Sequence, residues 1–113
     1  MNAHLTTISA VFLTIVFAVQ AQTIGVPKDE ALAKKSGCFK CHNDNKDAIG
    51  PSFNVIAAQY KDKLNASDAL IKTVKHGGKG NWTEVSHGVP MPPYSGRLSD
   101  AQIKNLVDWV MGL

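Results

Sequence analysis

Two amphipathic segments occupy the middle of the chain. The first places apolar residues at helical spacing, at Phe53, Ile56, Ala57, Tyr60 and Leu64. The second begins near Ser67, ends at about His76 and is followed by Gly77-Gly78. Its apolar positions are Leu70, Ile71 and Val74. This spacing predicts two helices that each bury one face.

One further helix is predicted on each side of this pair. Pro27 begins a segment with acidic residues in its first turn and lysines in its last turn, which suits the dipole of a helix that ends before Gly37. Near the C-terminus, Ser99 and Gln102 form a capping-box pair. The apolar stripe that follows consists of Ile103, Leu106, Val107 and Val110. No segment shows the period-two alternation of a strand, so we predict an all-α fold of about four short helices.

The stretch between His76 and Ser99 has no helical pattern. It is rich in glycine and proline, at Gly77, Gly78, Gly80, Gly88, Gly96, Pro90, Pro92 and Pro93. It also contains Trp82, Met91 and Tyr94, which are large side chains that favour burial. A loop of this length in a small domain needs a reason. We therefore expect it to wrap around a large buried group.

The first 21 residues have a different composition. Residues 1–21 combine a polar start, an apolar stretch and small residues at Val19 and Ala21, as in a cleaved export signal. The apolar stretch is interrupted by Ser9 and Thr14 and is shorter than the roughly 20 residues that span a bilayer. We expect residues 1–21 to be a signal peptide and residues 22–113 to be one domain. Because the start contains no Lys or Arg, an uncleaved membrane anchor stays open as an alternative.

The charge of the chain is modest and dispersed. The 113 residues include 12 Lys plus Arg and 9 Asp plus Glu, for a formal net charge of +3, and the first charged residue is Lys28. The lysines form no cluster and do not alternate with aromatic residues, which argues against nucleic-acid binding. A mature chain this small buries a limited share of its surface, so a bulky ligand, a metal or a disulfide would help to stabilise it.

A cysteine motif provides such a ligand. Residues 38–42 read Cys-Phe-Lys-Cys-His, the C-x-x-C-H sequence at which c-type haem is attached. The two thiols can form thioethers with the vinyl groups of a haem, and the adjacent histidine can reach the iron. Export agrees with this interpretation, because covalent c-type haem is expected to be attached after export. We expect one haem c, covalently bound through Cys38 and Cys41, with His42 as an iron ligand.

Three other interpretations of the cysteines fit the sequence less well. A disulfide between Cys38 and Cys41 would close a very small loop and leave the histidine unexplained. A thioredoxin-like redox pair expects a βαβ context, which the pattern does not show. A zinc site would need His76 and His87 as well, and these two histidines are further apart than in common zinc fingers.

The second axial ligand of the iron has four candidates in the mature chain: Met91, Met111, His76 and His87. Met91 is favoured because prolines on both sides restrict its backbone and remove amide donors, so that the segment cannot become helical. Met111 is more simply a core residue of the last helix. His76 suits a helix C-terminus, and His87 suits a solvated loop.

Together, these residues resemble a bacterial class I cytochrome c of the small c-551/c-552 type. The features that carry the resemblance are C-x-x-C-H, Gly50-Pro51, Trp82, Pro90-Met91-Pro92-Pro93 and a closing helix with Trp109. The resemblance covers nearly all of residues 22–113. It implies the cytochrome c fold, in which short helices surround one covalently bound haem and the first and last helices cross with Trp109 in their contact.

The resemblance also implies roles for individual residues. The carbonyl of Pro51 would accept a hydrogen bond from Nδ1 of His42. The indole nitrogen of Trp82 would hydrogen-bond a haem propionate, with an ordinary core aromatic as the alternative role of Trp82. Lys72 and Lys75 are both candidates for a place near the propionates. The segment between Trp82 and Met91 is longer than expected for the smallest members.

Ligation by His42 and Met91 would leave the iron no open position, which suits outer-sphere electron transfer. We therefore expect a periplasmic one-electron carrier that is not an enzyme and serves partner reductases, oxidases or dehydrogenases, without stable membrane insertion after signal cleavage. Lys35, Lys40 and Lys79 are candidates for steering an acidic partner. Two alternatives stay open: a cytochrome c subunit of a larger oxidoreductase, and a haem sensor in which the methionine is displaced.

Overall fold

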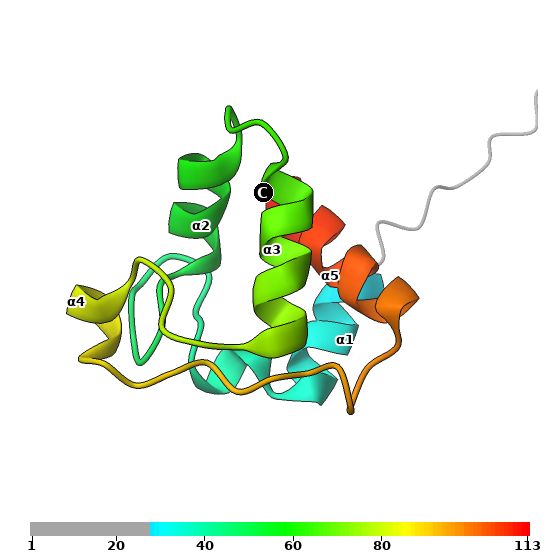
Figure 1. Ribbon diagram of the computed structural model, residues 1–113, viewed down its shortest axis with the longest axis horizontal. Helices are drawn as coiled ribbons and strands as arrows, with labels where there is room; N and C mark the ends of the chain where they lie inside the picture. Colours follow the sequence, from blue (N-terminus) through cyan, green and yellow to red (C-terminus); the bar gives the residue numbers. More distant parts are fainter. Residues whose placement is uncertain (1–27) are drawn as a thin grey trace, which may run out of the picture.

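The structure is a computed structural model that describes residues 28–113. The expected signal peptide, residues 1–21, and Pro27 lie outside the described residues. The described part consists of helices joined by loops (Figure 1). These elements are α1 (Lys28–Ser36), the 3₁₀ helix η1 (Cys38–Lys40), α2 (Phe53–Tyr60), α3 (Ala66–His76), α4 (Thr83–Ser86) and α5 (Asp100–Met111). Within this part no element is a β-strand, so the all-α prediction is confirmed.

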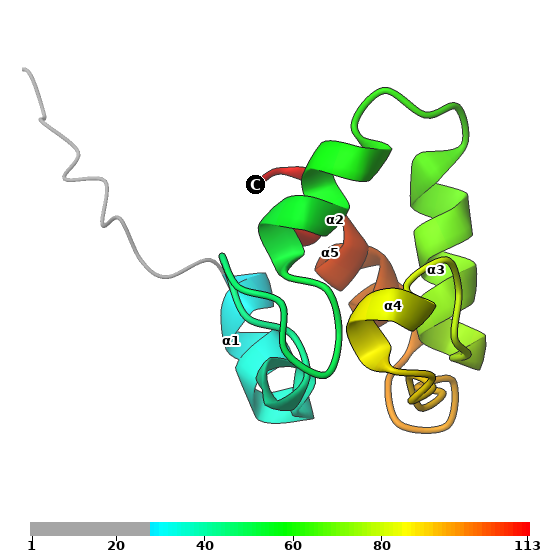
Figure 2. The ribbon, with the colours of Figure 1, turned by 90° about the vertical axis from the view of Figure 1, so that its left-hand side faces the viewer.

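Helix α5 is the centre of the packing. It contacts α1, α2 and α3, and its apolar stripe supplies the buried residues Ile103, Leu106 and Val107. Figure 2 shows α5 behind the space between α2 and α3, and Figure 1 shows it beside α3 and next to α1. The contact between α1 and α5 is the one expected of crossing first and last helices. The predicted capping box is also present, because the Gln102 amide donates to Ser99 Oγ (3.2 Å) and the Ser99 amide donates to Gln102 Oε1 (2.9 Å).

An aromatic cluster joins α5 to the segment that carries the cysteines. The ring of Trp109 lies 5.0 Å from that of Phe53 and 6.2 Å from that of Phe39, measured between centroids. Phe39 and Phe53 pack edge to face at 5.2 Å. Trp109 therefore connects α5 with both η1 and α2, and the cluster packs against the segment that carries the cysteine motif.

The first of the two middle helices is shorter than predicted, whereas α3 has nearly the predicted bounds. Helix α2 ends at Tyr60, so Leu64, which fits the apolar spacing, lies beyond the helix and is 91% exposed. The reason is the turn before α3, where Asn65 adopts a left-handed conformation with φ 57°. Spacing alone does not register such a break, because Leu64 keeps the period of the residues before it.

The stretch between α3 and α5 is not entirely without helix. Residues Thr83–Ser86 form the single-turn helix α4, which ends at His87 in a left-handed conformation. The remainder consists of turns and irregular segments, and it passes the C-terminal end of α3 before it reaches α5 (Figure 1). In the part of the chain that the structure describes, no helix is long and apolar enough to cross a membrane.

Candidate functional site

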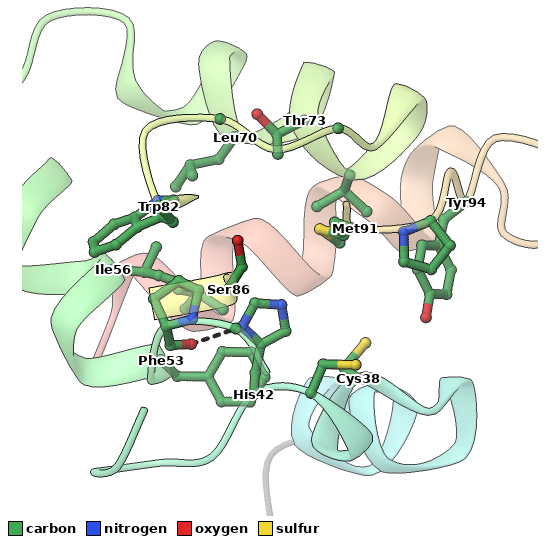
Figure 3. A pocket seen from close by; sticks show the side chains of 18 of the residues that line it. Cys38, His42, Phe53, Ile56, Leu70, Thr73, Trp82, Ser86, Met91 and Tyr94 are labelled. Carbon is green, nitrogen blue, oxygen red and sulfur yellow. Dashed lines mark hydrogen bonds between the residues drawn. The ribbon is translucent and has the colours of Figure 1, made fainter. Parts of the chain in front are cut away.

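One cavity of about 320 Å³ lies among these elements, within the size range of small-molecule sites. Segments from the whole described part of the chain contribute to its wall. All six residues expected at the haem line it, namely Cys38, Cys41, His42, Pro51, Trp82 and Met91. Figure 3 shows Trp82 and Cys38 at opposite ends of the cavity, with His42 and Met91 facing the space between them. The fold thus brings together residues that are up to 53 positions apart in the sequence.

Local turns place the two cysteines and the histidine at this cavity. Gly37, with φ 83°, ends α1 and starts the turn of η1, in which the amides of Cys41 and His42 both donate to the carbonyl of Cys38. The two cysteines are not disulfide-bonded. Burial raises the pKa of the Cys38 thiol, whereas reactive redox cysteines have a lowered pKa. This electrostatic setting argues against the thioredoxin-like interpretation.

The loop after the motif returns to support His42. The Gly50 amide donates to the carbonyl of Cys41 (2.8 Å), which brings Gly50-Pro51 against the histidine. His42 Nδ1 then donates to the carbonyl of Pro51 at 2.7 Å, the hydrogen bond that the resemblance implied (Figure 3). With the proton on Nδ1, the other ring nitrogen, Nε2, is left with a free lone pair. His42 is therefore oriented as a metal-binding imidazole is in other proteins.

Gly50 is required by the closeness of this contact. A Cβ atom at Gly50 would lie 2.8 Å from Cε1 and 3.0 Å from Nδ1 of His42, which is closer than carbon atoms pack. The Ser52 side chain begins α2 immediately afterwards by accepting from the Val55 amide, and the Ser52 amide donates to Asp47 Oδ1 (2.8 Å). The turn that presents Pro51 is thus held on both sides.

On the opposite side of the cavity, Met91 is fixed through its backbone. The Met91 amide donates to the carbonyl of Gly78, and the Gly78 amide donates to the carbonyl of Met91, both at 2.9 Å. Three residues later, the Tyr94 amide donates to Val74 of α3 (3.0 Å). The predicted proline-restricted segment is therefore hydrogen-bonded to the end of α3 at more than one point, which holds Met91 in place.

The alternative ligands lie elsewhere. Met111 is in the last turn of α5, His76 ends α3 and His87 caps α4, and none of the three is among the residues that line the cavity. Among the described residues, no group of three or more His, Cys, Asp or Glu side chains could hold a metal ion. The zinc interpretation therefore has no site in this part of the chain.

Two lysine expectations have different outcomes. Lys75 is paired with Asp100 (Nζ–Oδ1 2.9 Å), and neither Lys75 nor Lys72 lines the cavity. Lys79 does line it and is exposed. Of the three lysines that are candidates for steering a partner, Lys35, Lys40 and Lys79, only Lys79 lines the cavity.

The cavity also contains a polar group that the sequence did not indicate. Ser86 is 7% exposed, and its Oγ is the buried side-chain polar atom that lacks a hydrogen-bond partner among the described residues. A buried hydroxyl without a partner is unfavourable. A haem fits this cavity on three counts, which are the paired thiols beside His42, the free imidazole nitrogen and a hydroxyl that needs an acceptor. A serine in a segment without a helical or strand pattern carries no sequence signal for such a role.

Comparison with known proteins identifies the family. The cytochrome c family model matches residues 30–113. Cytochrome c-551 of Allochromatium vinosum is 42% identical over 85 residues, which are 75% of this chain and 85% of that protein. Cytochrome c-552 of Nitrosomonas europaea is 40% identical over 75% of this chain and 78% of that protein.

Solved structures agree with these relatives. The crystal structure of wild-type Nitrosomonas europaea cytochrome c552 superposes with a TM-score of 0.65 and 39% identity, covering 74% of this chain and 98% of that chain. A class 1 cytochrome from Sideroxydans lithotrophicus superposes with a TM-score of 0.60 and 33% identity, covering 74% and 90%. The chain therefore belongs to the cytochrome c family of haem-binding electron carriers, and it carries one haem c bound covalently through Cys38 and Cys41.

Proposed function

We propose that this protein is a periplasmic one-electron carrier in which His42 and Met91 are the axial ligands of the haem iron. The observation that carries the proposal is the placement of these two side chains. They reach the same cavity from different segments, beside the two cysteines that hold the haem (Figure 3). Haem iron with two protein ligands supplies a one-electron Fe²⁺/Fe³⁺ couple and has no open position for oxygen or a substrate.

The roles of the two ligands follow from how they are held. The hydrogen bond from His42 Nδ1 to Pro51 fixes the imidazole ring and increases the basicity of Nε2. The paired hydrogen bonds between Met91 and Gly78 hold the thioether at one place, so little rearrangement would accompany electron transfer. Thioether ligation favours a raised reduction potential. Trp82 lines the cavity at the end away from Cys38, which supports its role at a haem propionate (Figure 3).

The location and the partners belong to the same proposal. Export to the periplasm rests on the sequence of residues 1–21, with cleavage after Ala21 and a mature domain of residues 22–113. The partners would be reductases, oxidases or dehydrogenases that exchange electrons at the uncovered edge of the haem. The exposed Lys79 at the cavity mouth would favour an acidic partner surface. Steering would appear as an exchange rate that falls with ionic strength, and a flat dependence would remove it.

The test is a set of visible spectra of the matured protein, oxidised and reduced, with and without carbon monoxide. The unmodified protein and His87→Ala should both show a six-coordinate haem that ignores carbon monoxide. Met91→Ala should lose the sulfur-to-iron charge-transfer band and bind carbon monoxide. Ready carbon monoxide binding by the unmodified protein would instead indicate a sensor or an enzyme. A Met91→Ala spectrum that is unchanged would exclude Met91 as the ligand.

Co-purification distinguishes a free carrier from a subunit. A carrier should elute from a sizing column as a small protein after gentle lysis of the source cells. Elution with a larger oxidoreductase under the same conditions would contradict the proposal and support the subunit interpretation.

A further inference from the structure

Ser86 has an environment that its place in the sequence does not explain. It is the last residue of the single-turn helix α4, and its side chain is directed inward, not toward solvent. Its hydroxyl is buried, has no hydrogen-bond partner among the described residues and lines the haem cavity. Because buried polar groups in native proteins are almost always hydrogen-bonded, this hydroxyl requires an acceptor that the cavity receives from outside the polypeptide.

No polypeptide atom among the described residues accepts a hydrogen bond from this hydroxyl. The Pro51 carbonyl already accepts from His42, and the Tyr94 hydroxyl donates to the carbonyl of Ser36 (3.3 Å). The sulfur of Met91 is a weak acceptor at best. The four porphyrin nitrogens of a haem are bound to iron, so its two propionate carboxylates are the groups on its periphery that accept hydrogen bonds strongly.

A haem attached at Cys38 and Cys41 would direct those carboxylates toward the other end of the cavity, where Trp82 lies. The thioether bonds fix the vinyl half of the macrocycle at Cys38 and Cys41, and the propionates belong to the opposite half. Figure 3 shows Trp82 at the end of the cavity remote from Cys38, and the Ser86 hydroxyl pointing into the space between. Trp82 and Ser86 also belong to one helical turn, because the Ser86 amide donates to the carbonyl of Trp82 (2.9 Å).

We propose that the Ser86 hydroxyl donates a hydrogen bond to a haem propionate and that α4 is the turn that places it there. Ser86 is then a binding residue for the haem carboxylate that acts next to Trp82. This inference rests on the covalent haem c and is independent of the ligation by His42 and Met91. Removal of a donor leaves more negative charge on the carboxylate near the iron, which favours the ferric state.

The experiment compares Ser86→Ala with two controls in the haem-loaded protein. Ser86→Thr keeps a hydroxyl at the same position. Thr83→Ala removes an exposed hydroxyl from the same helical turn. The measurements are the redox-induced infrared difference spectrum with haem labelled with ¹³C at the propionates, the propionate bending band in resonance Raman spectra, and the reduction potential.

We expect Ser86→Ala to shift the labelled carboxylate bands and the propionate bending band and to lower the reduction potential. Ser86→Thr should restore the bands, and Thr83→Ala should leave them unchanged. Unchanged propionate bands in Ser86→Ala would overturn the proposal, even if the variant were less stable. If the sulfur-to-iron charge-transfer band moved and the propionate bands did not, the hydroxyl would act on Met91, which would also overturn it. Failure of the His42/Met91 proposal is recognised separately, from the charge-transfer band of the unmodified protein.

Discussion

Gly77 is the residue on which the position of Met91 depends most directly. It follows α3 with φ 68° and ψ −159°, a conformation that is essentially restricted to glycine. A Cβ atom on Gly77 would lie 2.2 Å from the carbonyl oxygen of Met91 and 2.9 Å from the carbonyl carbon of Pro92, both of which are backbone atoms. Gly77→Ala therefore cannot be accommodated by a side-chain rotation, and the Met91 segment has to move away from α3.

The cost has two parts. The backbone conformation contributes about 1–3 kcal/mol of strain when the residue is not glycine. Displacement of the segment weakens the two hydrogen bonds between Gly78 and Met91, which are worth about 1 kcal/mol each. We expect Gly77→Ala to lose about 3 kcal/mol of unfolding free energy, which lowers the Tm by roughly 12–24 °C in a domain of this size. The sulfur-to-iron charge-transfer band should weaken, because the thioether is no longer held in place.

The assay is thermal unfolding of the haem-loaded protein followed by circular dichroism, with the visible spectrum recorded at each temperature. Two glycines serve as controls. A Cβ atom at Gly78 (φ 118°) meets nothing within 4 Å, so Gly78→Ala measures the conformational strain alone. Gly96 has open space and no positive φ, so Gly96→Ala should be nearly neutral. A Gly77→Ala Tm within a few degrees of that of Gly96→Ala, with the band intact, would refute this reasoning.

Three further perturbations test other contacts. Gly50→Ala should tilt the ring of His42 and weaken its hydrogen bond to the carbonyl of Pro51. This change should destabilise the fold by about 1–3 kcal/mol and raise the reduction potential. An unchanged potential in a redox titration would contradict the prediction. Burial raises the pKa of the Tyr94 phenol, so the unfolded chain loses this proton first and the free energy of unfolding falls as pH rises above about 10. Urea unfolding at several pH values should show a smaller fall in Tyr94→Phe. An equal fall in the variant and the unmodified protein would argue against this assignment. Ser99→Ala removes the cap of α5 and should cost about 1 kcal/mol in thermal unfolding without a change in potential, whereas a shifted potential would mean that α5 acts on the haem.

The features that the sequence predicted well are those with local physical signals. The apolar stripe of α5 and its capping box need only neighbouring residues to be recognised, and both are present. The C-x-x-C-H motif indicates covalent haem attachment directly, since the spacing of the two thiols matches that of the haem vinyl groups. The contact of His42 with Pro51 came from the resemblance and not from the pattern, because the two residues meet only after the loop folds back.

The features that the sequence did not predict depend on tertiary packing. Helix α4 has four residues and no room for a periodic pattern, so nothing in Thr83–Ser86 marks it. The conformation of Gly77 depends on the close approach of the Met91 segment, and this contact cannot be predicted from the residues next to Gly77 in the sequence. Leu64 was predicted to be a helical, buried residue because it continues the apolar spacing, but the helix ends before it and its side chain is exposed.

The small size of the polypeptide core explains why these loop contacts matter so much. The buried apolar residues of the described part are Ala33, Phe53, Ala57, Ala66, Tyr94, Ile103, Leu106 and Val107, and three of them are alanines that bury little surface. All of these side chains except Tyr94 come from α5 or from helices that pack on it, whereas the segment with Trp82 and Met91 contributes its large groups to the wall of the cavity. Among residues 28–113, no side chain covers the apolar surface that this segment presents to the cavity. The haem therefore completes the core on this side, and the thioether bonds at Cys38 and Cys41 add stability by keeping it bound to the chain.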